Sequence, residues 1–297
     1  MARTLLADRR RFILWMLLPA VVFLLSLTLF PFLVGAFLSL TGYTLLEGGA
    51  WTFLGFSNYT ELMGSADFWS AFRVTVVFTF VAVSLQLMIG VGIAVLLHQE
   101  RKSATWLRTI YLLPMAITPV AATFSFRMML NPNLGVINHM MKALGLPPQA
   151  WLAAPELALP TLILVDSWQW TPFIILITAG GLAALPEEPF EAATIDGANG
   201  WQSFWHIMLP MLKPFLVIAV TFRAIDAFKT FDIIFVLTGG GPGITTRSLN
   251  LLAYNHGIKF LSMGYAAAIT ILMLIVTVVA CQVFLRKTEM FQPSAPS

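Results

Sequence analysis

Four charged residues stand three positions apart in an otherwise apolar stretch: Arg223, Asp226, Lys229 and Asp232. Residues three positions apart share one face of a helix, so these alternating charges can form a ladder of ion pairs that packs helices together. Arg223 and Asp226 can equally serve as donor and acceptor for a solute rich in hydroxyl groups. The spacing alone leaves both interpretations open, a packing ladder and the lining of a polar path.

A second polar group, with one Asp, one Gln and two Trp, interrupts an earlier aliphatic stretch at 166–170. Carbohydrate binding needs flat apolar faces for C–H surfaces and planar polar groups for hydroxyls, and these residue types supply both. Tryptophan also anchors helices at the membrane surface, although the middle of a span suits that role poorly. Two polar residues before the last apolar stretch are candidates for an outer gate or for contact with a partner protein on the outer side. The candidates for a substrate path are Asp166, Trp168, Gln169, Trp170, Arg223, Asp226, Asn250 and Tyr254.

The remaining residue types offer little for catalysis or metal binding. The four histidines are scattered, and the single cysteine, Cys281, has no partner for a disulfide or a thiolate metal site. No Gly-x-Ser-x-Gly nucleophile elbow occurs, and no Gly-Lys-Ser/Thr of a phosphate-binding loop follows the glycines at 239–243. We therefore expect no catalytic residue, no metal and no cofactor on this chain, which is then not an enzyme.

The elements that carry these residues are apolar enough to cross a membrane. Of the 297 residues 58% are hydrophobic and only 10% are charged, against about 25% charged in soluble domains, which excludes a water-soluble enzyme. The net charge of +3 is too small to indicate a nucleic-acid partner. Stretches of about 20 or more apolar residues cross the bilayer as helices. We expect an all-α membrane protein that forms a single transmembrane domain, 1–297, with six spans at 12–40, 71–97, 107–130, 157–182, 214–237 and 265–285.

The basic residues predict the orientation of these spans. Lys and Arg gather at 3–11, 101–108 and 286–287, whereas 41–70 contains neither. Arg73 and Arg127 favour the opposite orientation, but they are fewer. The positive-inside rule then predicts that both termini are cytoplasmic. The first apolar stretch is longer than the core of a signal peptide, so we expect it to remain as a span.

One predicted cytoplasmic loop, 183–212, is acidic rather than basic. Residues 187–195 are predicted to form a short helix that Gly197 ends, and 201–209 a second helix that stops before Pro210. A helix lying on lipid headgroups would favour Lys and Arg on its polar face, and these are missing here. Because the loop is not basic, we expect it to contact a partner protein.

The amino-acid sequence of this loop resembles that of a known protein family. Glu191-Ala192-Ala193, three residues, Gly197, nine residues, then Ile207-x-Leu209-Pro210 is similar to the signature of permease subunits of bacterial binding-protein-dependent ABC importers. Residues 191–214 and 231–242 resemble the carbohydrate-uptake branch, which includes the maltose and glycerol-phosphate permeases. Unlike the enlarged maltose permease, this chain has no large outer domain between its spans.

The resemblance implies a type I ABC importer permease fold, in a chain that crosses the bacterial inner membrane several times. It implies a second homologous permease, two cytoplasmic ATPases that bind ATP and Mg, an extracytoplasmic solute-binding protein, surrounding lipid and a carbohydrate substrate, with no nucleic acid. This chain would form half of the pathway, work by alternating access and couple to the ATPase through Glu191, Ala192, Ala193, Gly197, Ile207, Leu209 and Pro210.

Two alternatives remain open. The same architecture could import a polyol, a glycerophosphodiester or another polar solute, since the motif does not determine the ligand. A more distant alternative is an ion-coupled secondary transporter, for which we would expect inverted repeats and an ion site at the midplane. The sequence shows no repeat, and the acidic loop would have no use in such a protein.

Overall fold

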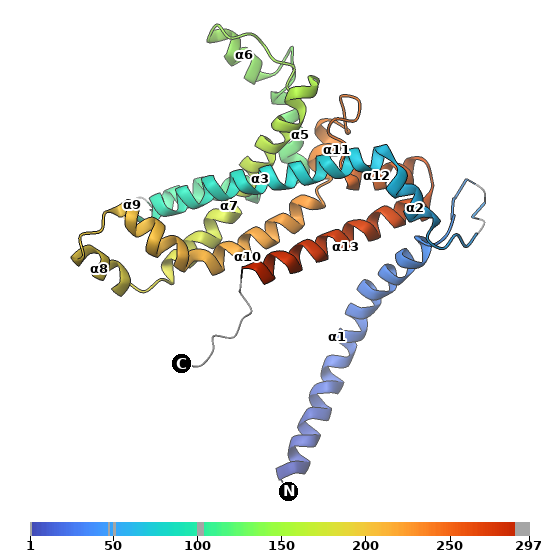
Figure 1. Cartoon of the computed structure of the whole chain (residues 1–297), viewed down its shortest axis with the longest axis horizontal. Coiled ribbons are helices and arrows are strands. Elements are labelled where there is room, and N and C mark those ends of the chain that lie inside the picture. Colours follow the sequence, from blue (N-terminus) through green and yellow to red (C-terminus); the bar gives the residue numbers. More distant parts are fainter. Residues whose placement is uncertain (1, 47, 50–51, 100–103, 289–297) are drawn as a thin grey trace. The chain divides into compact units, whose positions relative to one another are not determined.

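The computed structural model describes residues 2–46, 48–49, 52–99 and 104–288. Within these ranges the chain is helical, and its extended pairs are the isolated bridges Thr41–Phe53 and Thr44–Ser262. The prediction of an all-α protein is confirmed (Figure 1). The helices are α1 (Ala2–Leu38), α2 (Ser57–Gly64), α3 (Ala66–Gln99), α4 (Ala104–Ala116), α5 (Pro119–Met129), α6 (Val136–Ala143), α7 (Pro155–Ala183), α8 (Glu188–Ile195), α9 (Gly200–Ser203), the π-helical η1 (Phe204–Met208), α10 (Leu209–Phe228), α11 (Asp232–Leu237), α12 (Leu249–Tyr254), the π-helical η2 (Asn255–Lys259) and α13 (Met263–Lys287).

Five helical segments in the described ranges are long and apolar enough to cross a membrane, at 15–38, 66–98, 155–183, 200–228 and 263–287. The third predicted span, 107–130, is wrong as one straight helix, because α4 and α5 meet at a bend of 104°. Thr118, just before Pro119, has an extended ψ of 136°. Proline disfavours helical backbone in the residue before it, so the helix breaks at this point. The pair makes a sixth span if it is counted as one broken helix.

The fifth predicted span also differs from the structure. The sequence pattern predicted 214–237 as one helix, whereas α10 ends at Phe228 and α11 begins at Asp232. Lys229 caps α10, and its carbonyl accepts a 2.6 Å hydrogen bond from the Asn250 side chain instead of continuing the helix.

At its other end α10 continues directly from α9 and η1, so the predicted stop before Pro210 is wrong. The Leu209 N–H bonds to the Phe204 carbonyl five residues earlier, which is the spacing of a π-helical turn. Pro210 then falls in the first turn of α10, directly after the π-helical turn. The result is one helical rod over residues 200–228.

The chain divides into two compact units, which are described separately: Met1–Ser65 with Ala253–Leu272, and Ala66–Leu252 with Met273–Ser297. In the first unit, Asn58 donates to the carbonyls of Ser39 and Thr41 at 2.8 and 2.9 Å. Gly264 lies so close to Thr41 that a Cβ atom would be 2.0 Å from its carbonyl oxygen. The single transmembrane domain remains a prediction.

The second unit is built around α3, α7 and α10. Helix α3 packs along α7, and α10 packs against both (Figure 1). Gly90 allows α3 to approach Ile174 of α7, since a Cβ atom there would lie 2.7 Å from that side chain. This close approach brings the polar residues of the three helices together.

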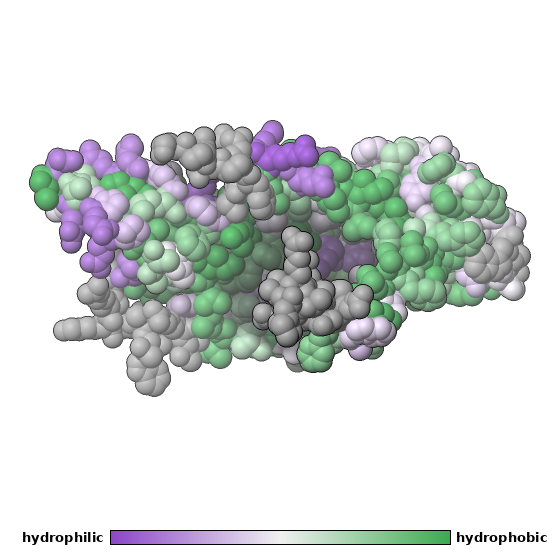
Figure 2. All heavy atoms as spheres, turned by 90° about the horizontal axis from the view of Figure 1, so that it is seen from below, coloured by the Kyte–Doolittle hydropathy of each residue, from purple (hydrophilic) through white to green (hydrophobic). Residues whose placement is uncertain are grey.

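Much of the surface is apolar. In Figure 2 hydrophobic side chains cover wide areas of the visible face, and hydrophilic ones gather in separate groups. Phe80 and Met88 of α3, for example, are 73% and 75% exposed. Exposed patches of this extent are unusual for soluble monomers and are typical of helices surrounded by lipid.

Candidate functional site

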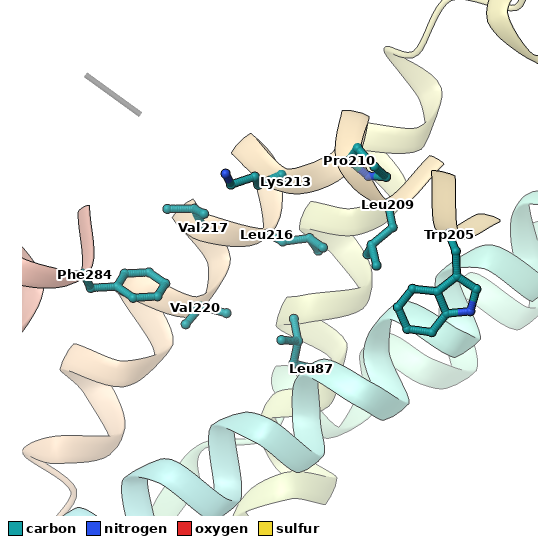
Figure 3. Close-up of a pocket in the computed structure, with 9 residues that line it drawn as sticks. All are labelled: Leu87, Trp205, Leu209, Pro210, Lys213, Leu216, Val217, Val220 and Phe284. Carbon is teal, nitrogen blue, oxygen red and sulfur yellow. The ribbon is translucent and has the colours of Figure 1, made fainter. Parts of the chain in front are cut away.

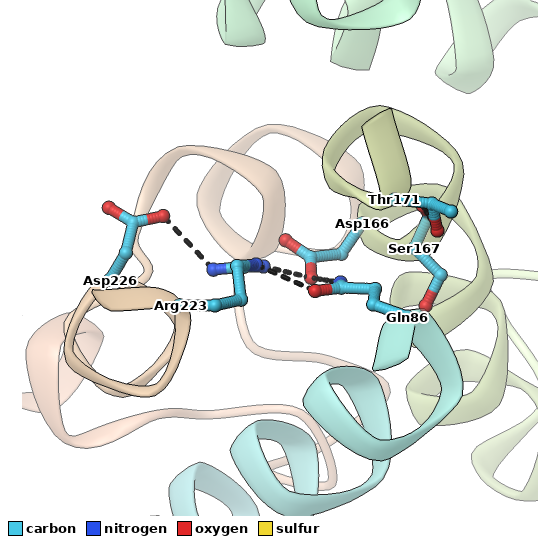
Figure 4. A network of polar contacts seen from close by, with 6 residues as sticks. All are labelled: Gln86, Asp166, Ser167, Thr171, Arg223 and Asp226. Atoms are coloured by element: carbon cyan, nitrogen blue, oxygen red, sulfur yellow. Dashed lines mark hydrogen bonds and ion pairs between the residues drawn. The ribbon is translucent and has the colours of Figure 1, made fainter. Parts of the chain in front are cut away.

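Arg223 of α10 lies at the centre of a polar cluster inside the second unit (Figure 4). Its Nε donates to Gln86 Oε1 of α3 at 2.8 Å, and its Nη1 to Asp226 Oδ2 at 3.0 Å. Its Nη2 forms an ion pair with Asp166 Oδ2 of α7. Gln86 Nε2 also donates to Asp166 Oδ2, at 2.8 Å. We call Gln86, Asp166, Arg223 and Asp226 the charge cluster.

The charge cluster joins three helices through groups that are almost fully buried. Arg223, Asp166 and Gln86 are 1%, 2% and 0% exposed. Charges removed from water are stable only when they are paired and hydrogen-bonded, and here each one is. The Asp226 side chain, by contrast, is 43% exposed. The cluster is therefore closed between the helices and open at Asp226.

Two adjoining cavities lie at this open side. One has a volume of about 210 Å³ and the other about 260 Å³. Both are lined by Trp170, Asp226 and Lys229. The Trp170 ring centroid lies 5.2 Å from the Arg223 guanidinium carbon, which is a cation–π contact. The first cavity is further lined by Pro119, Asp166, Gln169, Thr230, Phe231, Asp232 and Ile233.

The structure brings most of the predicted pathway residues together at these cavities. Asp166, Gln169 and Trp170 share one face of α7, and Gln169 donates to the Ile117 carbonyl at 3.3 Å, at the α4–α5 break. Trp168 lies elsewhere, because a residue two positions from Asp166 points away from that face. It is 42% exposed and packs edge-on against Phe126, with centroids 5.0 Å apart.

The two candidates for an outer gate have different positions. The Asn250 side chain is used in holding the carbonyl of Lys229 at the end of α10. Tyr254 belongs to the other compact unit, where it is the last residue of α12. The pathway roles of both remain predictions.

The predicted ladder of ion pairs is present in part. Arg223 and Asp226 are paired, but among the described residues neither Lys229 nor Asp232 forms an ion pair. The break between α10 and α11 interrupts the three-residue spacing, and both side chains line the first cavity. The two charges therefore face the cavity rather than each other.

Gln86 is a member of the charge cluster that the sequence patterns did not predict. The signal was a single amide in the apolar stretch 71–97, and polar groups within a membrane span generally face a partner or a cavity.

The predicted coupling loop is a helix, a turn and a helix, as the sequence indicated. Gly197 follows α8 with a φ of +80°, which only glycine adopts without strain. Asn199 and Gln202 form a capping box at the start of α9, with hydrogen bonds of 2.9 Å in each direction. Glu191 and Ala192 are exposed, whereas Ala193 is buried.

A cavity of about 600 Å³ lies beneath α8, so this helix is not tightly packed on the bundle. It is lined by His98 of α3, by Glu187, Phe190, Glu191 and Thr194, by Met208 of η1, and by Leu182, Ala183, Leu185 and Pro186 at the end of α7. In the described part of the chain, no three His, Cys, Asp or Glu side chains are placed to hold a metal ion.

Comparison with known proteins identifies the family of this chain. Residues 86–287 match the family model described as "Binding-protein-dependent transport system inner membrane component". The trehalose/maltose transport system permease protein MalF of Thermococcus litoralis is 39% identical over 79% of this chain and 79% of its own length. The sulfoquinovosyl glycerol transport system permease protein SmoG of Agrobacterium fabrum is 32% identical over 91% and 88%.

A solved structure supports the fold. A bacterial alginate ABC transporter, in complex with an alginate pentasaccharide-bound periplasmic protein, matches with a TM-score of 0.82, 21% identity and 95% coverage of both chains. The family match covers more than half of the chain and includes the charge cluster and the predicted coupling loop. The chain therefore belongs to the family of binding-protein-dependent transport system inner membrane components.

Proposed function

We propose that this chain is the permease subunit of an ATP-driven sugar importer and forms half of its translocation pathway. The observation that carries the proposal is the extended identity to permeases named for trehalose and maltose and for sulfoquinovosyl glycerol. It rests on named relatives that cover most of the chain rather than on a short motif.

The cavities beside the charge cluster have the chemistry that a sugar requires. The Trp170 ring offers a flat apolar face to the C–H surface of a sugar ring. Asp226, Asp232 and Lys229 offer acceptors and donors to hydroxyl groups. Because the Asp226 side chain is partly exposed while Asp166 is buried, Asp226 is the carboxylate of the cluster available to a solute.

The helical rod over 200–228 offers a physical route for coupling. It begins in the coupling loop and carries Arg223 and Asp226 near its other end. A rigid rod converts a displacement at one end into a tilt at the other, which is what alternating access needs. The hollow beneath α8 leaves room for such a displacement. In this proposal α8, Gly197 and the start of the rod contact a cytoplasmic ATPase.

The proposed complex contains a second homologous permease, two ATPases that hold ATP and Mg²⁺, and an extracytoplasmic solute-binding protein. The chain lies in the bacterial inner membrane with both termini cytoplasmic, as the distribution of Lys and Arg predicts.

The substrate class is tested by reconstituting the chain in liposomes with the permease, ATPases and binding protein encoded beside it. ATP hydrolysis is measured with a panel of neutral sugars, acidic sugars, polyols, amino acids and ions. We expect a carbohydrate to stimulate hydrolysis when the binding protein is present. Stimulation by an amino acid or an ion, and by no carbohydrate, would overturn the proposed substrate class.

A further inference from the structure

An apolar groove runs along α10 at the coupling-loop end of the second unit (Figure 3). Its volume is about 420 Å³. The residues contributed by η1 and α10 follow a helical stripe, and one side chain each comes from α3 and α13. They are Trp205, Leu209, Pro210, Lys213, Leu216, Val217, Val220, Leu87 and Phe284.

Lys213 is the one charged residue among those that line the groove. It is exposed, and no described carboxylate pairs with it. In Figure 3 its amine points away from the apolar side chains, while Trp205 lies at the opposite end of the groove from Phe284. A lysine beside lipid places its amine at the membrane surface and its stem along apolar atoms.

The order of residues along η1 and α10 matches the layers of one membrane leaflet. Trp205 comes first, Lys213 follows, and Leu216, Val217 and Val220 come last. Tryptophan and lysine favour the headgroup level, and aliphatic side chains the hydrocarbon. Lys213 to Val220 spans about 10 Å at 1.5 Å per residue, which fits within the ~15 Å of half the hydrocarbon core.

The charges at this end favour an anionic ligand. Helix α13 ends with Arg286 and Lys287 just after Phe284, and both side chains are exposed. None of the described residues that line the groove is acidic. Basic residues beside a membrane surface attract anionic lipids. A bare phosphate ion would satisfy Lys213 but would leave the aliphatic wall of the groove uncovered.

We propose that this groove binds an anionic phospholipid of the coupling-loop leaflet, with its phosphate at Lys213 and an acyl chain along Leu216, Val217 and Val220. The site adjoins the π-helical turn and includes Leu209 and Pro210, where the coupling loop meets α10. The lipid therefore supports the joint through which the loop and the span move together.

The proposal is tested by native mass spectrometry of the full chain, purified with its transporter subunits, stripped of lipid and titrated with phosphatidylglycerol or phosphatidylcholine. We expect phosphatidylglycerol to bind more tightly and Lys213→Glu to weaken it about tenfold, since one attraction is replaced by a repulsion. Lys142→Glu, which changes an exposed lysine on α6, serves as the matched control and is expected to bind as wild type.

A second variant tests the groove separately from the charge. Leu216→Trp fills the groove and keeps Lys213, so we expect binding of both lipids to fall; Val220→Phe replaces it if the first variant does not insert. Equal affinity for the two lipids, or unchanged phosphatidylglycerol binding in Lys213→Glu and the groove-filling variant, would overturn the proposal. A disulfide between the cysteine of a Val220→Cys variant and a cysteine introduced on a helix of another subunit would also overturn it, because a protein would then occupy the groove. None of these measurements depends on transport.

Discussion

The charge cluster and the coupling loop use their few charged residues in opposite ways. In the cluster, Arg223 and Asp166 are nearly inaccessible and bond to each other and to Gln86. In the loop, Glu191 is exposed, and a hollow lies beneath its helix. The same residue types therefore hold helices together in one region and remain available to a partner in the other.

The difference separates stability from function within the second unit. Removing one partner from a buried pair leaves an uncompensated charge, which damages the fold itself. Changing an exposed side chain affects stability little, so its effect appears in binding. Arg223 and the second half of the loop, α9 and η1, belong to the same helical segment, whereas α8 precedes it, and variants in each region test whether the two can be broken independently.

The largest effect is expected for Arg223→Met, which leaves Asp166 buried without its cation. We expect a loss of about 3–5 kcal/mol of stability, because a broken buried pair costs that much. The measurement is thermal unfolding of the detergent-purified protein. Arg286→Met, an exposed arginine at the end of α13, is the matched control and should unfold near the wild-type temperature.

A double variant checks the cause of that loss. Asp166→Leu combined with Arg223→Met removes both charges and should recover part of the stability lost by Arg223→Met alone. If the single variant were as stable as wild type, the cluster would not hold the three helices together.

The next largest effect is expected on uptake, without a loss of membrane insertion. Glu191→Lys reverses an exposed charge on α8, and Gly197→Trp places a bulky side chain at a φ of +80°. Under the proposed function we expect both to abolish uptake while the protein still inserts, because the change falls on the surface that would contact the ATPase. Glu156→Lys, in the first turn of α7, is the control that should keep uptake. Full transport by a Glu191→Lys variant that co-purifies normally with its ATPase would contradict the proposed coupling role of the loop.

A smaller effect is expected within the loop. Asn199→Ala removes the capping box of α9 and should cost about 1 kcal/mol locally. Amide hydrogen exchange over 199–203 should become faster, while exchange around the charge cluster stays unchanged. Asn199→Asp keeps an accepting oxygen and should preserve protection. Faster exchange in the cluster would show that the two regions are not separable.

The smallest stability effect is expected for Asp226→Asn, at the open side of the cluster. Its ion pair with Arg223 is partly exposed, so we expect a loss of only about 0.2–1 kcal/mol. Under the proposed function the same change should raise the substrate KM for uptake, since Asp226 lines both cavities. A stability loss as large as that of Arg223→Met would make Asp226 a structural residue.

Hydrophobicity made much of the fold predictable from the sequence. Apolar stretches identified the spans, and the propensities of residues 187–195 together with Gly197 predicted α8 and its end. Pro119 carried a signal for the break in the third span, but a window average of hydropathy passes over a single proline.

The parts of the site that depend on tertiary contacts were not predictable in the same way. Asp166 and Arg223 stood out as charges in apolar stretches, but their pairing with each other and with Gln86 depends on how α3, α7 and α10 pack. Trp168 adjoins the site in sequence and faces Phe126 in the structure, which only the rotation of α7 decides.

The proposed ATP-driven import is tested most directly by uptake of labelled substrate into liposomes that hold the complete transporter. The same measurement is then repeated with single components left out. We expect ATP-dependent uptake that requires the binding protein and the ATPases and disappears in Glu191→Lys. Uptake that persists without the ATPases, driven by a proton or sodium gradient, would contradict it.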